Sequence, residues 1–157
     1  MKNRDNQQTN SFRIGWIVGI LEGEGWFILD KMWNWNKKWH IYKPMIGMNN
    51  TDETIIKQTD DILTEWKVGH HITKRNMKYP WKDQWQLIIF GMKRCTSLLE
   101  IILPYMSAKK KQAQLLMDFI EYRETKTSHD RHGKVETAFY EKLKGLNRKG
   151  KVSTTKH

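Results

Sequence analysis

Cysteine, acidic residues and long apolar runs are all scarce in this sequence, and each shortage excludes a class of protein. Cys95 is the only cysteine among 157 residues, so no disulfide can form within the chain and a reducing compartment is expected. The mostly apolar run at residues 14–21 is far shorter than the roughly 20 residues of a membrane span. The N-terminal segment lacks the apolar core of a signal peptide. We therefore expect a soluble intracellular protein without a targeting signal, in the cytoplasm, the nucleoid or an organelle matrix.

Acidic residues are outnumbered: 17 Asp and Glu stand against 28 Lys and Arg, which gives a net charge of +11. Such a surplus favours a polyanionic partner, either nucleic acid or an anionic membrane, over a merely soluble basic surface. The hydrophobic fraction of 38% excludes a compositionally disordered chain. The length fits one folded domain, which we expect over residues 11–146 between a flexible N-terminus, 1–10, and a basic flexible tail, 147–157.

Hydrophobic periodicity and capping residues predict an α+β protein. Short connections within each strand pair make the sheet antiparallel, and the helices gather on one of its faces. Helices are expected at 11–23, 49–66, 93–106, 107–124 and 135–147, and strands at 26–33, 39–48, 68–76 and 84–91.

Charge is sorted among these elements. The first strand pair, residues 25–50, has four lysines against Asp30, and residues 69–94 have six basic residues against Asp83. The intervening helix at 51–66 has five acidic residues against Lys57. The strands therefore carry the positive charge, and the sheet face without helices is expected to be solvated, basic and wide enough for a duplex.

Three glycines lie four residues apart at Gly15, Gly19 and Gly23, in an expected helix. They share one helix face, and each costs about 1 kcal/mol relative to alanine, so a compensating gain is needed. Close approach of a second helix supplies such a gain. No second strip of this kind exists in the chain, which predicts a homodimer with this helix on its twofold axis.

Glu22 and Glu24 end the same helix and point to nearly opposite sides of it. A twofold axis brings each acid near its symmetry mate, and two close carboxylates favour a divalent cation. Acidic groups in a basic surface are suited to metal-dependent phosphodiester hydrolysis. The simpler interpretation is that both glutamates end the helix in solvent, although acids near a helix C-terminus oppose its dipole.

The segment "IVGILEGEG", Ile17 to Gly25, resembles the signature of the LAGLIDADG homing endonucleases. The order of elements matches the αββαββα domain of that family, with an antiparallel sheet saddle and extra C-terminal helices. The segment "LPYMSAKKKQAQLL", residues 103–116, is similar to the family's late proline-then-lysine helix start. One signature in a short chain resembles the homodimeric subclass.

The resemblance implies roles for individual residues. Glu24, helped by the backbone carbonyl of Gly23, would bind the catalytic Mg²⁺ or Mn²⁺, and no organic cofactor is implied. Glu22 would be structural at the helix end. Lys109 matches a basic residue near the scissile phosphate, and Asn50 matches a polar residue that positions water. The chain departs from the family in having Glu at both acidic positions and Val18 in place of alanine beside the dimer helix.

Strand alternation predicts which side chains read DNA. Glutamine suits adenine, and lysine suits guanine or phosphate. In the third strand Thr73 and Arg75 face oppositely to Lys74, and Arg75 is preferred as outward. The full expected set is Ile28, Asp30, Met32, Asn34, Lys37, Lys38, Trp39, Ile41, Lys43, Met45, Thr73, Lys74, Arg75, Gln84, Gln86, Lys110 and Lys111.

These observations predict an intron-encoded, site-specific double-strand DNA endonuclease that depends on a divalent metal and cuts a long pseudo-palindromic site as a homodimer. The alternative is an intron RNA maturase or a DNA-binding protein on the same fold without cleavage. A basic ribosome-associated protein is a third reading, for which acids beside a glycine strip have no purpose. The histidines at 70–71 and 129–132 lack zinc-like partners.

Overall fold

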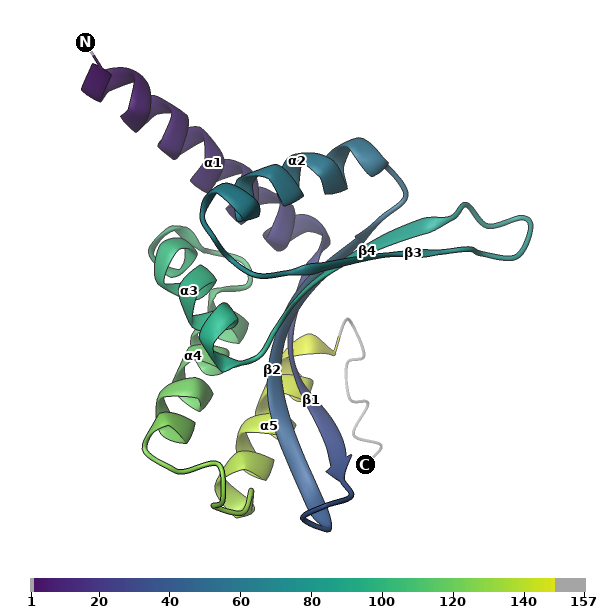
Figure 1. Cartoon of the computed structure of the whole chain (residues 1–157), viewed down its shortest axis with the longest axis vertical. Helices are drawn as coiled ribbons and strands as arrows, with labels where there is room; N and C mark the ends of the chain where they lie inside the picture. The colour runs from purple at the N-terminus through teal and green to yellow at the C-terminus, as the bar shows by residue number, and fades with distance from the viewer. Residues whose placement is uncertain (1, 149–157) are drawn as a thin grey trace, which may run out of the picture.

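The computed structural model describes residues 2–148 and has the predicted α+β order (Figure 1). The predicted fold class is confirmed. The elements are α1 (Lys2–Glu24), β1 (Gly25–Asn34), β2 (Trp39–Asn50), α2 (Glu53–Glu65), β3 (His71–Arg75), β4 (Gln84–Phe90), α3 (Met92–Ile102), the 3₁₀ turn η1 (Leu103–Tyr105), α4 (Lys110–Glu124) and α5 (Lys134–Asn147).

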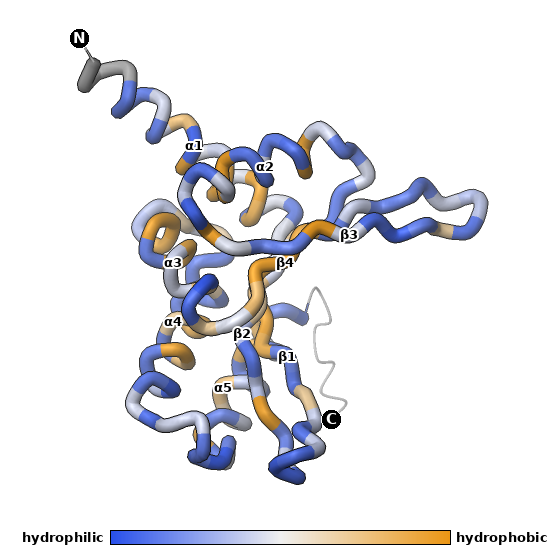
Figure 2. The backbone as a smooth tube through the Cα atoms, viewed as in Figure 1, coloured by the Kyte–Doolittle hydropathy of each residue, from blue (hydrophilic) through white to orange (hydrophobic). Residues whose placement is uncertain are grey.

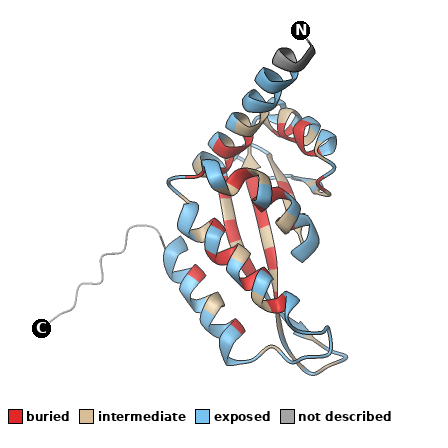
Figure 3. Cartoon of the chain, turned by 90° about the vertical axis from the view of Figure 1, so that its left-hand side faces the viewer, coloured by how far each residue is buried: buried red, intermediate tan, exposed pale blue. Residues whose placement is uncertain are grey.

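The four strands form one antiparallel sheet in the order β1-β2-β4-β3. Alternate strand residues such as Phe27, Ile46 and Leu87 are fully buried against the helices, as the red stripes of Figure 3 show. Their neighbours along each strand face the other way. We call that side the open face. The outer part of the β3–β4 hairpin extends beyond the helices and is largely hydrophilic (Figures 1 and 2).

Helix α1 buries one side and exposes the other. Ile17, Val18 and Leu21 lie in the core, whereas Gly15, Gly19 and Gly23 lie on the exposed side. Val18 is 8% exposed, and its side chain packs in the core of its own protomer.

Helix α1 begins at Lys2 rather than near Ser11, which corrects the predicted start. Residues 2–10 are therefore helical, not an irregular N-terminal segment. Extending a helix that is already nucleated adds one backbone hydrogen bond for each residue fixed, and this gain does not need an apolar stripe. Of the predicted tail 147–157, Asn147 ends α5 and residues 149–157 lie outside the described residues.

Helix α5 closes the β1 edge of the sheet. The side-chain amide of Asn147 donates to the carbonyl of Phe27 at 2.8 Å. Helix α5 is joined to α4 by a buried ion pair, in which Arg123 donates to Glu136 at 2.9 Å. Glu136 also accepts from the backbone of Gly133, and burial, which raises its pKa, is outweighed by these bonds, so the pKa of Glu136 is lowered. The last helices thus form a rigid support for the first hairpin.

Candidate active site and nucleic-acid interface

Glu22 fixes the end of α1 to the turn that precedes α4. Its carboxylate accepts hydrogen bonds from the backbone of Ser107 at 2.6 Å, the hydroxyl of Ser107 at 3.0 Å and the backbone of Lys109 at 3.3 Å. Burial raises the pKa of Glu22, but these hydrogen bonds outweigh it and lower the pKa below its usual value. This carboxylate therefore holds two segments 85 residues apart in position, as expected of a structural residue.

Lys109 joins the same junction from the other side. Its ammonium donates to the carbonyl of Leu21 at 3.2 Å and to the carbonyl of Gly25 at 2.5 Å. The last carbonyls of a helix have no intrahelical donor, so a lysine here satisfies them and complements the negative end of the helix dipole. Its charge lies beside the motif backbone, where a phosphate approaching the helix end would meet it.

Glu24 has surroundings unlike those of Glu22. Its side chain is exposed, and it forms no hydrogen bond or ion pair with any other residue that the structure describes. Gly23, directly before it, is exposed in the last turn of α1. Carboxylate and carbonyl oxygens are the donors that Mg²⁺ and Mn²⁺ prefer, so this pair fits the predicted metal.

One protomer does not supply a complete metal site by itself. Within residues 2–148 no three His, Cys, Asp or Glu side chains gather closely enough to hold an ion. The remaining donors would have to come from a second copy of the motif, from phosphate oxygens or from water.

The glycine strip has no cause inside the protomer. A Cβ atom added at Gly15, Gly19 or Gly23 would meet nothing within 4 Å. Phe12, one turn before Gly15 on the same side of α1, is 59% exposed. The separate protomer therefore does not require glycine at any of these positions. The exposed Phe12 ring extends the same side of the helix toward the N-terminus.

The open face carries most of the side chains that alternation predicted. Directly opposed residues of antiparallel strands project to the same side, so the register shows which residues share this face. Gln84 and Gln86 share it with Arg75 and Thr73, as preferred from the sequence. The opposed pairs are Ile28–Met45, Asp30–Lys43, Met32–Ile41 and Asn34–Trp39 in the first hairpin, and Thr73–Gln86 and Arg75–Gln84 in the second.

Lys74 is not on the open face, unlike the other strand residues of the predicted set. It lies opposite Trp85, whose neighbours Gln84 and Gln86 face the other way. The Lys74 ammonium sits 5.4 Å from the centre of the Trp85 ring and 3.7 Å from the Asp83 carboxylate. Alternation already separated Lys74 from Arg75, and the structure places only Arg75 on the open side.

Trp39 and Lys37 turn toward the loop between α4 and α5. The Lys37 ammonium donates to the carbonyl of Ser128, and both Lys37 and Arg131 lie 5.9 Å from the centre of the Trp39 ring. Lys38 is exposed in the adjoining turn. Lys110 and Lys111 are exposed in the first turn of α4, close in sequence to the segment held by Glu22.

Asn50 does not share the side of the predicted DNA-reading residues. It pairs with Trp85 at the end of β2, and its side-chain oxygen accepts from the backbone of Asp52 at 2.8 Å before α2 begins. Its neighbour Asn49 pairs with Gln86 on the open face. The Oδ1 atom of Asn49 is buried, and no residue of the described chain donates to it.

Trp26 is a second residue of the open face that the sequence prediction missed. It pairs with Gly47, where an added Cβ would lie 2.4 Å from the indole ring, so the glycine makes room for the tryptophan. Trp26 and Asn49 both lie on the open face near the C-terminal end of α1. Extending the predicted strand alternation further toward the "IVGILEGEG" segment would have identified both residues.

No protein-family model matches the sequence, and no curated protein matches it either. Solved structures do match. The archaeal intron-encoded homing endonuclease I-Vdi141I complexed with DNA is 15% identical, covers 91% of this chain and 89% of its own, and superposes with a TM-score of 0.71. The homing endonuclease I-CvuI in complex with its target and Ca is 17% identical over 88% of this chain and 96% of its own, with a TM-score of 0.61. The chain has the LAGLIDADG homing endonuclease fold.

The described residues contain one copy of the LAGLIDADG fold. The LAGLIDADG homing endonuclease I-SmaMI bound to cleaved DNA is 16% identical and has a TM-score of 0.60, but the match covers 89% of this chain and only 45% of that one. The present chain thus corresponds to nearly all of I-CvuI and to about half of I-SmaMI. Among the described residues, no helix has the length and apolarity that crossing a membrane requires.

Proposed function

We propose that the chain is a site-specific double-strand DNA endonuclease of the homing type that acts as a homodimer. The position of Glu24 carries this proposal. An exposed carboxylate, unpaired among the described residues, stands where the glycine-strip helix ends and the first strand of the open face begins. A fold that merely binds a polyanion gains nothing from a negative charge at this place.

A twofold arrangement of α1 helices supplies what one protomer lacks. Contact along Gly15, Gly19 and Gly23 lets two backbones approach closely and places both α1 ends side by side. Each protomer then contributes Glu24 and the Gly23 carbonyl to one central site, and the two open faces continue as one surface. The match to half of I-SmaMI supports a second copy as the missing half.

Three features of the chain then act together on a bound duplex. Lys43 and Arg75 hold phosphates or guanine edges on the open face, and Gln84 and Gln86 read adenine edges. Glu24 and the Gly23 carbonyl would hold Mg²⁺ or Mn²⁺ at the centre. The metal, when bound, supplies an activated water and stabilises the leaving oxygen.

Lys109 and Glu22 support the centre without holding the metal. The Lys109 ammonium, 3.2 Å from the carbonyl of Leu21, provides a positive charge beside the phosphate that is cut. Glu22 fixes the turn that carries Lys109, so the distance between this charge and Glu24 is set before DNA arrives. We further propose that the gene lies in an intron and that the target spans its insertion point.

A plasmid library of random inserts tests cleavage without knowledge of the target. The protein is incubated with the supercoiled library in Mg²⁺, in Mn²⁺ or in EDTA, and the ends that appear are sequenced. The proposal expects linear products at one related set of inserts with metal and none with EDTA. Binding to enriched inserts with no cutting in either metal would contradict it, and would favour the non-cleaving alternative on this fold.

A further inference from the structure

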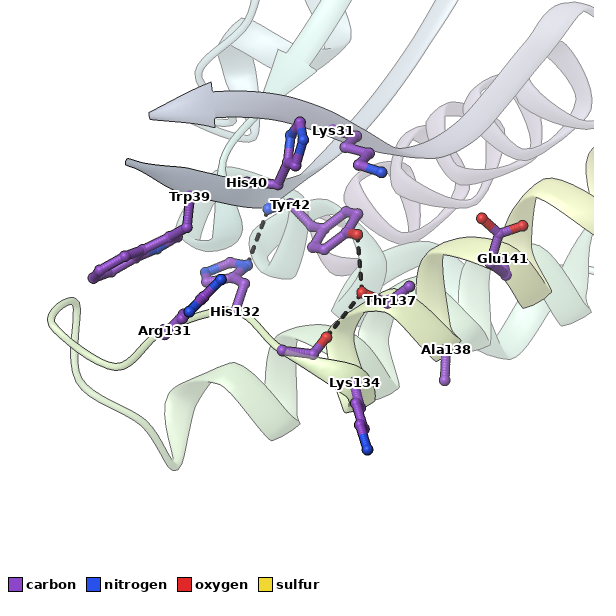
Figure 4. A pocket seen from close by; sticks show the side chains of 11 residues that line it. Lys31, Trp39, His40, Tyr42, Arg131, His132, Lys134, Thr137, Ala138 and Glu141 are labelled. Atoms are coloured by element: carbon purple, nitrogen blue, oxygen red, sulfur yellow. Dashed lines mark hydrogen bonds between the residues drawn. The ribbon is translucent and has the colours of Figure 1, made fainter. Parts of the chain in front are cut away.

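An open cleft of about 810 Å³ lies between the far end of the β1–β2 hairpin and the start of α5 (Figure 4). Lys31 and His40 project into it from the hairpin, and Arg131 and Lys134 border it from the opposite side. Lys31 and His40 belong to the helix-side face of the hairpin, because they alternate with Met32 and Trp39. The cleft therefore lies on the helix side of the hairpin, and of the strand residues that line it only Trp39 belongs to the open face.

The walls of the cleft are fixed by contacts across it. The Tyr42 hydroxyl lies 3.0 Å from the Thr137 hydroxyl, and the Tyr42 backbone donates to Nδ1 of His132 at 3.0 Å. Burial, together with the charges of Arg123 and Lys37, lowers the pKa of His132, which keeps Nδ1 free to accept that bond. The cleft thus exists before any ligand enters it, as binding sites commonly do.

Its charge favours an anion. Lys31, Arg131 and Lys134 line it against a single acid, Glu141. Arg131 and Lys134 are exposed, so their charges are available to a ligand. Phosphate groups match this lining, since Arg131 can bind phosphate through two hydrogen bonds and the lysines add positive charge.

Aromatic rings continue the cleft toward the hairpin turn. Trp33 packs edge-on against His40 with ring centres 5.0 Å apart, and Trp35 packs edge-on against Trp33 at 6.3 Å. Trp35 is 83% exposed. Large rings left in solvent next to the His40 wall of the cleft give bases a surface to stack on, and the cations of the cleft give phosphates a place to bind.

We propose that this cleft and the adjoining rings bind unpaired nucleotides of a single-stranded nucleic acid, as a second site apart from the duplex surface. A duplex keeps its base faces stacked internally, so it can use the cations but not Trp33 or Trp35. A single strand can use both. The phosphates lie along Arg131 and Lys134, and one or two bases lie on the exposed tryptophans.

Fluorescence anisotropy with labelled oligonucleotides tests this site. The probes are an oligo(U) RNA, an oligo(dT) DNA of equal length, an abasic strand of that length and a perfect duplex. Trp35→Ala should weaken binding of the unpaired strands about five-fold or more, which corresponds to the lower end of base–aromatic stacking. It should leave the abasic strand and the duplex unchanged. The RNA and DNA arms show which sugar the site prefers.

Charge is tested by a pair of matched double variants. Arg131→Ala/Lys134→Ala should weaken single-strand binding more than Lys57→Ala/Lys142→Ala, which removes the same charge from exposed sites outside the cleft. Circular dichroism checks that each variant folds. Unchanged single-strand affinity in both cleft variants would overturn the proposal. So would equal losses for duplex and single strand in Trp35→Ala, because the exposed rings would then belong to the duplex surface.

Discussion

Glu22 and Glu24 are two residues apart, yet they have opposite surroundings. Glu22 accepts three hydrogen bonds from residues 107–109, whereas Glu24 is exposed and unpaired among the described residues. The Glu22 contacts hold two segments of the chain together, and the Glu24 carboxylate faces solvent. Two identical side chains are therefore assigned different roles by the contacts that the fold gives them.

At this scale we predict that Glu24→Gln abolishes cleavage but not DNA binding. Glutamine keeps the size of the side chain but loses the charge that holds the metal, so both strand cuts should fail together. Affinity should persist or rise, because a negative charge near phosphates is removed. A gel shift beside a cleavage assay on the selected target measures both. Cutting at a near wild-type rate would show that Glu24 is not the metal ligand.

Glu22→Gln is the matched change and should act on stability rather than on the metal. Hydrogen bonds lower the pKa of Glu22 from its usual 4.5, so the carboxylate stabilises the fold above that value. This contribution is lost as the pH falls through the lowered pKa. Thermal unfolding from pH 7 down to pH 3 should show a smaller drop for Glu22→Gln than for the wild type. At neutral pH the variant should be less stable by on the order of 1 kcal/mol. Parallel curves would contradict this role.

At the scale of elements, α1 has two functions: one side builds the core and the other is free. We predict that Gly19→Leu disrupts dimerisation, because a side chain cannot fit where two backbones touch. In the separate protomer the change should be tolerated, since a Cβ at this position meets nothing within 4 Å. Sedimentation velocity measures the assembly.

Gly145→Leu is the control for that change. Gly145 is also a helical glycine with nothing within 4 Å of an added Cβ, but it lies on α5 rather than on the strip. This variant should remain a dimer. If both variants stay dimeric, the strip is not the interface and the proposed central site has no second half.

Strand alternation predicted the sheet well because it is a local property. Phe27 and Leu29 had to face the core, which fixed the direction of Ile28 and Asp30 on β1. The sequence could not reveal contacts between distant segments. Arg131 reaches Trp39 from a loop more than 90 residues away in the chain, and no local pattern contains that contact.

Other differences between the sequence prediction and the structure have local causes. Residues 2–10 have no apolar stripe, so periodicity could not extend α1 to Lys2. Asn50 matched a family position, but its oxygen bonds to Asp52 at the start of α2, and its neighbour Asn49 takes the place on the open face. Near a strand end, one residue of register decides which face a side chain joins. The signature itself identified the α1–β1 junction correctly.

At the scale of the whole molecule, the open face carries basic residues, and the helix α2 behind its end of the sheet carries acidic ones. The open face has Lys43 and Arg75, and the helix behind it has an acidic first turn at Glu53. A basic surface backed by acids directs a duplex to one side rather than to any side. A protein that is basic throughout would bind DNA in many orientations and would not align Glu24 with a phosphate.

The salt dependence of binding measures this arrangement. Each phosphate contact releases counterions, and log affinity falls with log salt by about 0.9 for each contact in a duplex. We predict a steep linear fall for the wild type between about 50 and 200 mM salt.

Arg75→Gln and Lys43→Gln should each make the fall of log affinity with log salt shallower. In a homodimer one substitution removes two contacts, so the slope should change by about 1.8 rather than 0.9. Lys57→Gln, on the acidic helix α2, should leave the slope unchanged. A slope that responds equally to all three changes would mean that the open face is not the DNA surface.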